Sequence, residues 1–282
     1  MKHNIHLSPI LLGVALAAFA AQSQLAFASG PIISGDLVQL HYVCRLENGE
    51  VAASTMAESS LGVAEKKSSI FEPIQNDAPL SLQAGLDPKN QGVPAVVDFS
   101  DEIAAQIAHS LVGLQRNEAQ TVKVSAARAH YREKAVISMV RVRQRPKELR
   151  MLPGEYSKRM GKDAEVGQVF TLDPDFPGKV VSSGENEVLI RFEAPANKKL
   201  VTPFGPAMVR ESENQYLVDI DVRNEALVRT GPMVGRITAV DEKMFTVDYG
   251  HPLGGQDLVC DLSFLSADNE QKEGGEKNAT AE

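Results

Sequence analysis

The sequence predicts an α+β protein in which short antiparallel strands greatly outnumber helices. Residues 234–265 contain three apolar or alternating runs separated by an acidic turn and a glycine- and proline-rich bend, which is typical of strands joined by reversals. Leu37–Leu46 alternates in the same way and is followed by Asn48-Gly49, a strong short-range signal of a hairpin. One helix is predicted over 102–112, where apolar residues recur at helical spacing.

The first 28 residues are interpreted as a secretory signal peptide rather than as part of the fold. Ile10–Ala21 is an apolar stretch too short to span a bilayer comfortably. Ala26-Phe27-Ala28 fits the small-x-small rule for cleavage. An uncleaved anchor is the alternative. The remaining chain of about 254 residues is therefore expected to be periplasmic or otherwise exported, with no membrane partner after signal cleavage.

The charge balance argues against one class of partner. With 29 Lys and Arg against 37 Asp and Glu, the chain carries a formal net charge of −8 at pH 7. No basic stripe is available to neutralise phosphates, so we expect no nucleic-acid partner. The one basic concentration, Arg141–Lys147, is interpreted as a solvated strand end or linker, with a polyanion site as the alternative. Two cysteines are too few for a disulfide scaffold.

Further elements of the first half follow from local patterns. Ala78–Ala84 can form a strand, and Asp87–Pro94 is a turn cluster rich in Pro, Asn and Gly. Ser100-Asp101 can cap the helix predicted over 102–112. Thr121–Ala127 is then expected to be a strand, with its valines on one face.

Two segments resemble SlyD-type FKBP peptidyl-prolyl isomerases. That family returns from an inserted flap through a valine-aspartate-x-x-His-Pro-Leu-x-Gly turn, which His251-Pro252-Leu253 and Gly255 match. The family's usual Asn before the His is Gly250 here. Residues 34–56 resemble the family's first core strand, acidic-x-Gly turn and short return strand, with Tyr42 at the position of a cavity tyrosine.

The resemblance implies an FKBP-like antiparallel sheet around one short helix, formed by residues 29–135 and 251–266. An inserted β-rich flap domain would occupy residues 136–250, much longer than the family's usual insert. Val136–Arg145 and the amphipathic Glu148–Met160 resemble the first strand and helix of such a flap.

A weak internal repeat accounts for part of the long insert. Three segments share one design, a Gly followed by a strand, an acidic turn and a second strand. Their turns lie at Glu185, Glu213 and Asp241, which are 28 residues apart each time. Single hairpins cannot bury an apolar face, so we expect these to pack together as a sheet or small barrel. A β-rich composition that mimics a period is the alternative.

The resemblance also assigns candidate site residues. Tyr42 and Tyr131 take the positions of cavity tyrosines and are the catalytic candidates. Five residues take positions that line the cavity and are the binding candidates: Ile103, Ala104, Ile107, Cys260 and Ala53. Ala53 stands where the family has an Asp and Cys260 where it usually has a Phe, so weakened catalysis is expected. For the helix residues, core packing alone is the alternative.

The implied function is that of an exported peptidyl-prolyl cis–trans isomerase and folding factor acting on X-Pro bonds of exported proteins. Its partners would be unfolded or partly folded polypeptide clients, and the protein would be a monomer. The alternative is an inactive FKBP-like chaperone or assembly-partner module that works through the flap. Prolyl isomerisation needs no nucleophile, and we expect no cofactor. The acidic tail, 267–282, contains no His or Cys and no apolar periodicity, so we expect it to be disordered and expect no metal.

The family topology has a consequence for the two cysteines. It places the strand of Cys44 beside the closing strand of Cys260, with both side chains on the cavity face because side chains alternate along a strand. Directly opposed residues can form a disulfide, whereas a diagonal offset can prevent one. The register cannot be read from the sequence. Two buried free thiols are the expectation, and a Cys44–Cys260 bridge is the alternative.

Overall fold

The computed structural model describes residues 30–86, 98–116, 118–129, 131–133, 135–194 and 199–265. The predicted signal peptide, the turn cluster at 87–94 and the tail at 267–282 lie outside these residues. Within them the protein is mostly antiparallel sheet with two short α-helices, so the α+β class is confirmed. None of these helices is long and apolar enough to cross a membrane.

A five-stranded sheet, here called the core sheet, joins both ends of the described chain. Its strand order is β2-β1-β17-β4, with β3 also paired to β1. The strands are β1 Leu37–Arg45, β2 Val51–Ser54, β3 Leu80–Gln83, β4 Gln120–Val124 and β17 Leu258–Phe264. The predicted pairing of the first strand with the closing strand is confirmed, with Tyr42 opposite Leu262.

Helix α1, Phe99–Ser110, packs on the core sheet and begins three residues earlier than predicted. The side chain of Asp98 caps the helix by accepting a hydrogen bond from the Asp101 backbone N–H at 2.7 Å. The cap is therefore neither Ser100 nor Asp101, the two residues that were predicted. An Asp at this position satisfies one of the N–H groups that a helix start leaves without a partner. After β4, a short 3₁₀ turn at Ala126–Arg128 replaces the last residues of the predicted strand.

The expectation of two free thiols is wrong, because the structure contains a Cys44–Cys260 disulfide. The strand register places these residues directly opposite each other on β1 and β17, with their Cα atoms 4.0 Å apart. A direct opposition brings the sulfur atoms within bonding reach, which a diagonal offset would not. Both cysteines are fully buried on the face that α1 covers.

A single run of chain, residues 136–151, provides one strand to each of three further sheets. We call it the ribbon, and residues 136–250 as a whole the arm. The ribbon bends at Arg141 and Lys147 into β5 Val136–Val140, β6 Val142–Pro146 and β7 Glu148–Met151. The helix predicted over 148–160 is only partly correct, since α2 spans Pro153–Met160. Its first turn starts at a proline, which fits that position because the missing N–H has no partner there anyway.

The predicted repeat units exist, but they do not form one sheet or barrel. Each unit is a hairpin with a preceding strand, and each unit pairs with a different part of the ribbon. The resulting sheets are β7-β10-β9-β8, β11-β12-β13-β6 and β14-β15-β16-β5. Their strands are β8 Val169–Phe170, β9 Gly178–Ser183, β10 Val188–Phe192, β11 Lys199–Thr202, β12 Gly205–Glu211, β13 Gln215–Ile220, β14 Leu227–Thr230, β15 Met233–Val240 and β16 Met244–Asp248.

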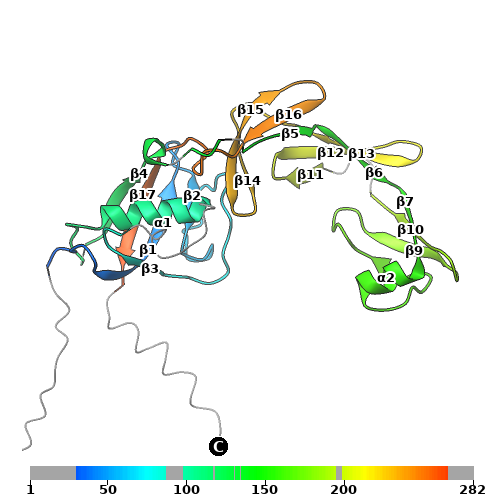
Figure 1. Ribbon diagram of the computed structural model, residues 1–282, viewed down its shortest axis with the longest axis horizontal. Coiled ribbons are helices and arrows are strands. Elements are labelled where there is room, and N and C mark those ends of the chain that lie inside the picture. Colours follow the sequence, from blue (N-terminus) through cyan, green and yellow to red (C-terminus); the bar gives the residue numbers. More distant parts are fainter. Residues whose placement is uncertain are drawn as a thin grey trace, which may run out of the picture.

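The three sheets of the arm follow one another away from the core sheet, so the molecule is long and curved (Figure 1). The β14–β16 sheet lies next to the core sheet, and the sheet with β9 and α2 lies at the far end. The outer sheet has its own apolar cluster around Tyr156 and Phe170, whereas the two inner sheets share another around Phe204 and Phe245. The core sheet and α1 enclose a separate cluster, which Val234 of β15 joins.

Candidate functional site

Five of the seven predicted site residues meet in the buried cluster between the core sheet and α1. Tyr42, Ala53 and Cys260 come from three neighbouring strands, and Ile103 and Ile107 come from one face of α1. Ala104, also predicted, is partly buried against the same cluster. Strand pairing explains the convergence, because Ala53 and Cys260 both lie opposite Cys44 from the two sides of β1.

Tyr42 is the chemically distinctive member of this cluster. Only 6% of the residue is exposed, and no described residue hydrogen-bonds to its hydroxyl. Burial raises the pKa of Tyr42 to about 12, the positive charge of Arg229 opposes this shift, and the negative charge of Asp98 adds to it. The hydroxyl therefore stays protonated at neutral pH and can donate a hydrogen bond inside a mostly apolar surrounding.

Tyr131, the second predicted catalytic residue, is not part of this cluster. It is 47% exposed, and its hydroxyl donates to Oδ2 of Asp248 at 3.2 Å. The Asp248 carboxylate raises the pKa of Tyr131. The ring lies against Gly250, at the junction of the arm and the closing segment. The structure thus buries Tyr42 in the core cluster and leaves Tyr131 outside this cluster.

The arm contributes a residue that the sequence analysis missed. The Arg229 guanidinium lies 5.6 Å from the ring centroid of Phe99, and it donates to the Ile70 backbone oxygen at 3.2 Å. It also forms an ion pair with Glu72 at 2.6 Å. Arg229 thus covers the ring of the first α1 residue and links the irregular segment after β2 to the arm. One sequence signal exists: the residue 28 positions earlier in the repeat is Val201, so an arginine here departs from the neighbouring unit.

Two backbone contacts hold the β14–β15 hairpin against the same region. The Phe99 N–H donates to the Pro232 carbonyl at 3.2 Å, and the Ser69 hydroxyl donates to the Leu227 carbonyl at 2.9 Å. Leu227 and Val234 add apolar contact with the core cluster. The hairpin therefore packs on the Phe99 side of the cluster with side-chain and backbone interactions.

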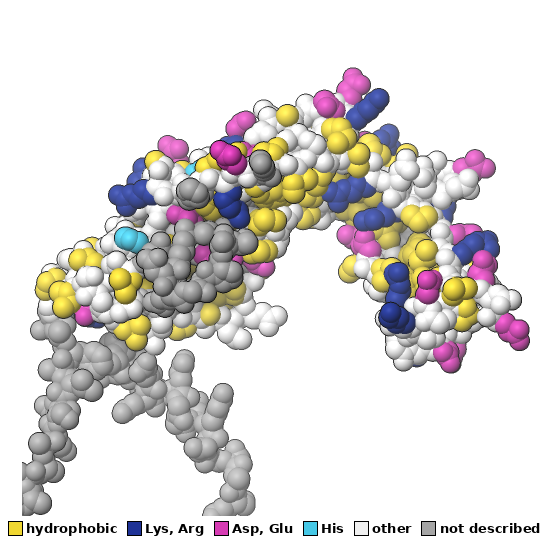
Figure 2. Space-filling model, viewed as in Figure 1, with side chains coloured by type: hydrophobic (Ala, Val, Ile, Leu, Met, Phe, Trp, Pro, Cys, Tyr) yellow, Lys and Arg dark blue, Asp and Glu magenta, His cyan; other side chains and the backbone are white. Residues whose placement is uncertain are grey.

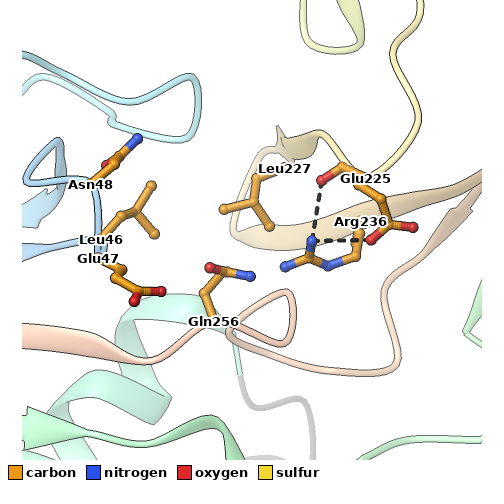
Figure 3. A pocket seen from close by; sticks show the side chains of 7 residues that line it. All are labelled: Leu46, Glu47, Asn48, Glu225, Leu227, Arg236 and Gln256. Atoms are coloured by element: carbon orange, nitrogen blue, oxygen red, sulfur yellow. Dashed lines mark hydrogen bonds and ion pairs between the residues drawn. The ribbon is translucent and has the colours of Figure 1, made fainter.

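A shallow pocket of about 410 Å³ lies where the arm meets the core sheet (Figure 3). Leu46, Glu47 and Asn48 of the β1–β2 turn form one side, with Gln256 beside them. Glu225, Leu227 and Arg236 of the arm form the other side. The Arg236 guanidinium donates to the Glu225 backbone and carboxylate oxygens and to the Gly254 carbonyl. Its main role is therefore to link the arm to the segment before β17.

His251 of the His-Pro-Leu turn has a positional role. Its Nε2 lies 2.9 Å from the Ala126 carbonyl, and its Nδ1 accepts from the Leu253 N–H at 3.2 Å. This pairing requires the proton on Nε2 and holds the turn against the end of β4. Among the described residues, no group of three or more His, Cys, Asp or Glu side chains could hold a metal ion.

Comparison with known proteins adds no assignment. No protein-family model matches the chain, and no curated protein matches it. The functional argument therefore rests on the geometry around Tyr42 and on the residues that resemble the SlyD-type FKBP pattern.

Proposed function

We propose that this chain is an exported FKBP-like peptidyl-prolyl isomerase and folding factor that acts on X-Pro bonds. The observation that carries the proposal is Tyr42: only 6% of this residue is exposed, it belongs to an apolar cluster, and its hydroxyl is not among the fully buried polar atoms that lack a partner. A prolyl peptide bond rotates over a barrier of about 18–20 kcal/mol that arises from amide resonance. An apolar site with one fixed donor favours the twisted amide, because it removes water from the carbonyl and orients it.

The location proposed for this activity is an exported compartment. The Cys44–Cys260 disulfide supports it, since such bonds persist mainly in oxidising surroundings. The His-Pro-Leu turn and the first hairpin support the FKBP-like assignment of the core sheet. Ala53 stands beside Cys44, where the family's Asp would add a second polar group, so catalysis is expected to be weak.

A proline-limited refolding assay tests this function. The mature protein should accelerate the slow refolding phase of a model substrate, and Tyr42→Phe should reduce that rate severalfold while leaving the packing of the ring in place. Ala53→Asp should increase it. Tyr131→Phe serves as the matched control and should leave turnover unchanged, because Tyr131 lies outside the cluster. Equal turnover in the wild type and in Tyr42→Phe would contradict the assignment.

A second candidate is a client-binding protein without catalysis, and the arm favours it. Figure 2 shows hydrophobic side chains gathered on the inner, concave side of the arm near its two inner sheets. Exposed large apolar residues of these sheets are Val136, Ile137, Val140, Val201 and Met208, of which Ile137 points to the opposite face of β5 from Val136 and Val140. Such a surface fits partly folded polypeptides. Suppression of client aggregation without any acceleration of prolyl isomerisation would select this function.

A further inference from the structure

The ribbon has one paired edge and one open edge. At its first bend, Arg141 donates its N–H to the Lys243 carbonyl of one sheet, and its carbonyl accepts from the Ile220 N–H of the next. Lys147 links two sheets in the same way at the second bend. Backbone groups of successive strand residues point to opposite edges, so the even-numbered residues of 136–150 face away from all three sheets. No described residue hydrogen-bonds to the backbone on that side.

The open edge is protected along β6 and β7 but not along β5. Charged side chains and proline at an edge prevent pairing with other chains. β6 and β7 carry several such residues, namely Arg143, Arg145, Pro146, Glu148 and Arg150. β5 contains no charged residue and no proline, and it is the edge strand of its sheet (Figure 1). Val136 and Val140 are 48% and 50% exposed there. Another strand can therefore be added to the ribbon at β5.

The sequence of β5, Val-Ile-Ser-Met-Val, is self-complementary about Ser138. When two copies of β5 pair in antiparallel fashion around Ser138, Val136 of each copy lies opposite Val140 of the other. Ile137 likewise lies opposite Met139, so apolar side chains meet on both faces of the joined sheet. Val136, Ser138 and Val140 are the residues whose N–H and C=O face the open edge. Each of these opposed pairs can therefore exchange two hydrogen bonds, as in a regular antiparallel ladder.

The charges on either side of β5 also suit a second copy. Glu133 precedes Ser138 by as many residues as Arg143 follows it, so a two-fold axis at Ser138 brings the acidic end of one copy towards the basic end of the other. Glu133 is exposed. The Arg143 guanidinium lies 5.2 Å from the ring centroid of Phe204, and burial together with the charge of Arg145 lowers the pKa of Arg143. An approaching carboxylate stabilises such a cation, which favours a second copy over an uncharged segment.

We propose that β5 pairs with β5 of a second copy of this chain, giving a two-fold symmetric dimer. The strand order of the joined sheet is β14-β15-β16-β5-β5-β16-β15-β14. This inference does not depend on the proposed isomerase function, and it differs from the monomer that the resemblance implies. The contact is isologous, so it uses the β5 edge of both copies and leaves none for a third. Two short strands form a small interface, so we expect a weak and reversible dimer.

Sedimentation equilibrium of the mature protein measures the association. Samples from roughly 1 to 100 μM cover the dissociation constants of weak dimers. Ser138→Pro removes an N–H that faces the open edge, where Pro146 already occupies an equivalent position of the ribbon. It should raise the dissociation constant at least about tenfold, because one hydrogen bond from each copy is lost. Gln144→Pro is the matched control, since it makes the same change on β6 and should leave the dimer intact.

Ser138→Ala separates the backbone from the side chain. This variant loses the hydrogen bond between the Ser138 and Thr246 hydroxyls but keeps the N–H, so it should still dimerise. Circular dichroism checks that each variant remains folded.

A cross-link tests the position of the axis. The two cysteines of the chain form a disulfide with each other, so Ser138→Cys introduces the one free thiol. A residue on the axis lies opposite itself at a Cα separation of about 5.5 Å, which suits a disulfide. Mild oxidation should therefore give a covalent dimer on a non-reducing gel. Gln144→Cys is the control and should stay monomeric on the gel, because its two copies lie apart.

The outcomes are distinct. A monomer at every concentration would overturn the proposal, and so would a dimer that Ser138→Pro leaves unchanged, because another surface would then hold it. A monomer that binds a synthetic peptide of alternating Val and Thr, and loses it in Ser138→Pro, would assign the β5 edge to extended client segments instead. None of these measurements reads isomerase turnover, so failure of the dimer and failure of the proposed function are distinguishable.

Discussion

The ring of Tyr131 packs directly on Gly250. A Cβ atom added at Gly250 would lie 2.5 Å from Cε2 of Tyr131 and 2.7 Å from the Arg132 carbonyl oxygen, so no larger residue fits without movement. This contact explains why a residue without a side chain stands at this position. It also fixes the joint between the arm and the closing segment, together with the hydrogen bond from Tyr131 to Asp248.

The first prediction follows from this contact. Gly250→Ala should lower the free energy of unfolding by about 1–3 kcal/mol, the usual effect of overpacking. In a Tyr131→Ala background the loss should be smaller but not zero, because the Arg132 carbonyl remains close. Urea unfolding of the four proteins in a double-mutant cycle measures the coupling. Additive effects would mean that the ring does not set the requirement for glycine.

The second prediction concerns the disulfide. The bond closes a loop with a sequence separation of 216 residues, so its loss should lower the stability by on the order of 5 kcal/mol in the chain-entropy model. Unfolding of the protein with and without a reductant gives this difference, and a Cys44→Ala/Cys260→Ala variant should not respond to the reductant. Thiol titration of the denatured, unreduced protein should find no free thiol. Two titratable thiols per chain would contradict the bridge.

The third prediction concerns alkaline pH. The pKa of Tyr42 is about 12 in the folded protein against an ordinary value near 10, because burial disfavours the phenolate. Between pH 10 and 12 the unfolded chain loses this proton first, so the contribution of Tyr42 to stability should be constant below pH 10 and fall by about 2–3 kcal/mol as the pH rises to 12. Tyr42→Phe should remove this part of the pH dependence. The same slope in both proteins would mean that another group is responsible.

The fourth prediction concerns the end of the arm. Ile190 is fully buried in the separate apolar cluster of the outer sheet, so Ile190→Ala should destabilise that sheet by about 2–5 kcal/mol. Hydrogen exchange should accelerate in β7 to β10 and α2 and stay unchanged in the core sheet. Ile103→Ala, in the core cluster, is the matched control and should have the opposite distribution. Uniform acceleration by both variants would show that the molecule unfolds as one cooperative unit.

The core sheet could be predicted in outline because its signals are local. Alternation marked β1 and β17, Asn48-Gly49 marked the hairpin, and the pattern around His251 indicated which strands should meet. The register could not be predicted, since shifting two strands by two residues preserves the alternation on which the argument depends. That is why the direct opposition of Cys44 and Cys260 was missed.

The candidate site was predicted only in part for a similar reason. Residues on α1 and the core strands converge because regular elements fix their faces, which is the case for Tyr42 and Ile107. Tyr131 lies in an irregular segment, where tertiary packing against Gly250 decides its position. Arg229 reaches the site from another sheet, and no local pattern links it to Phe99. The 28-residue period likewise indicated hairpins but not the strand that completes each of them.

The ribbon makes the length of the arm depend on two distant parts of the sequence. Along the chain, the three hairpin units are placed from the far end of the arm towards the core sheet, whereas the ribbon runs from the core sheet towards the far end. Met244 lies opposite Val140, Tyr216 opposite Arg145 and Val188 opposite Met151. Adding or deleting one unit therefore requires a matching change of about one short strand in the ribbon, far from the unit itself. A deletion of either part alone would leave the other with an unpaired edge. The arm can change its reach only through two coordinated insertions or deletions.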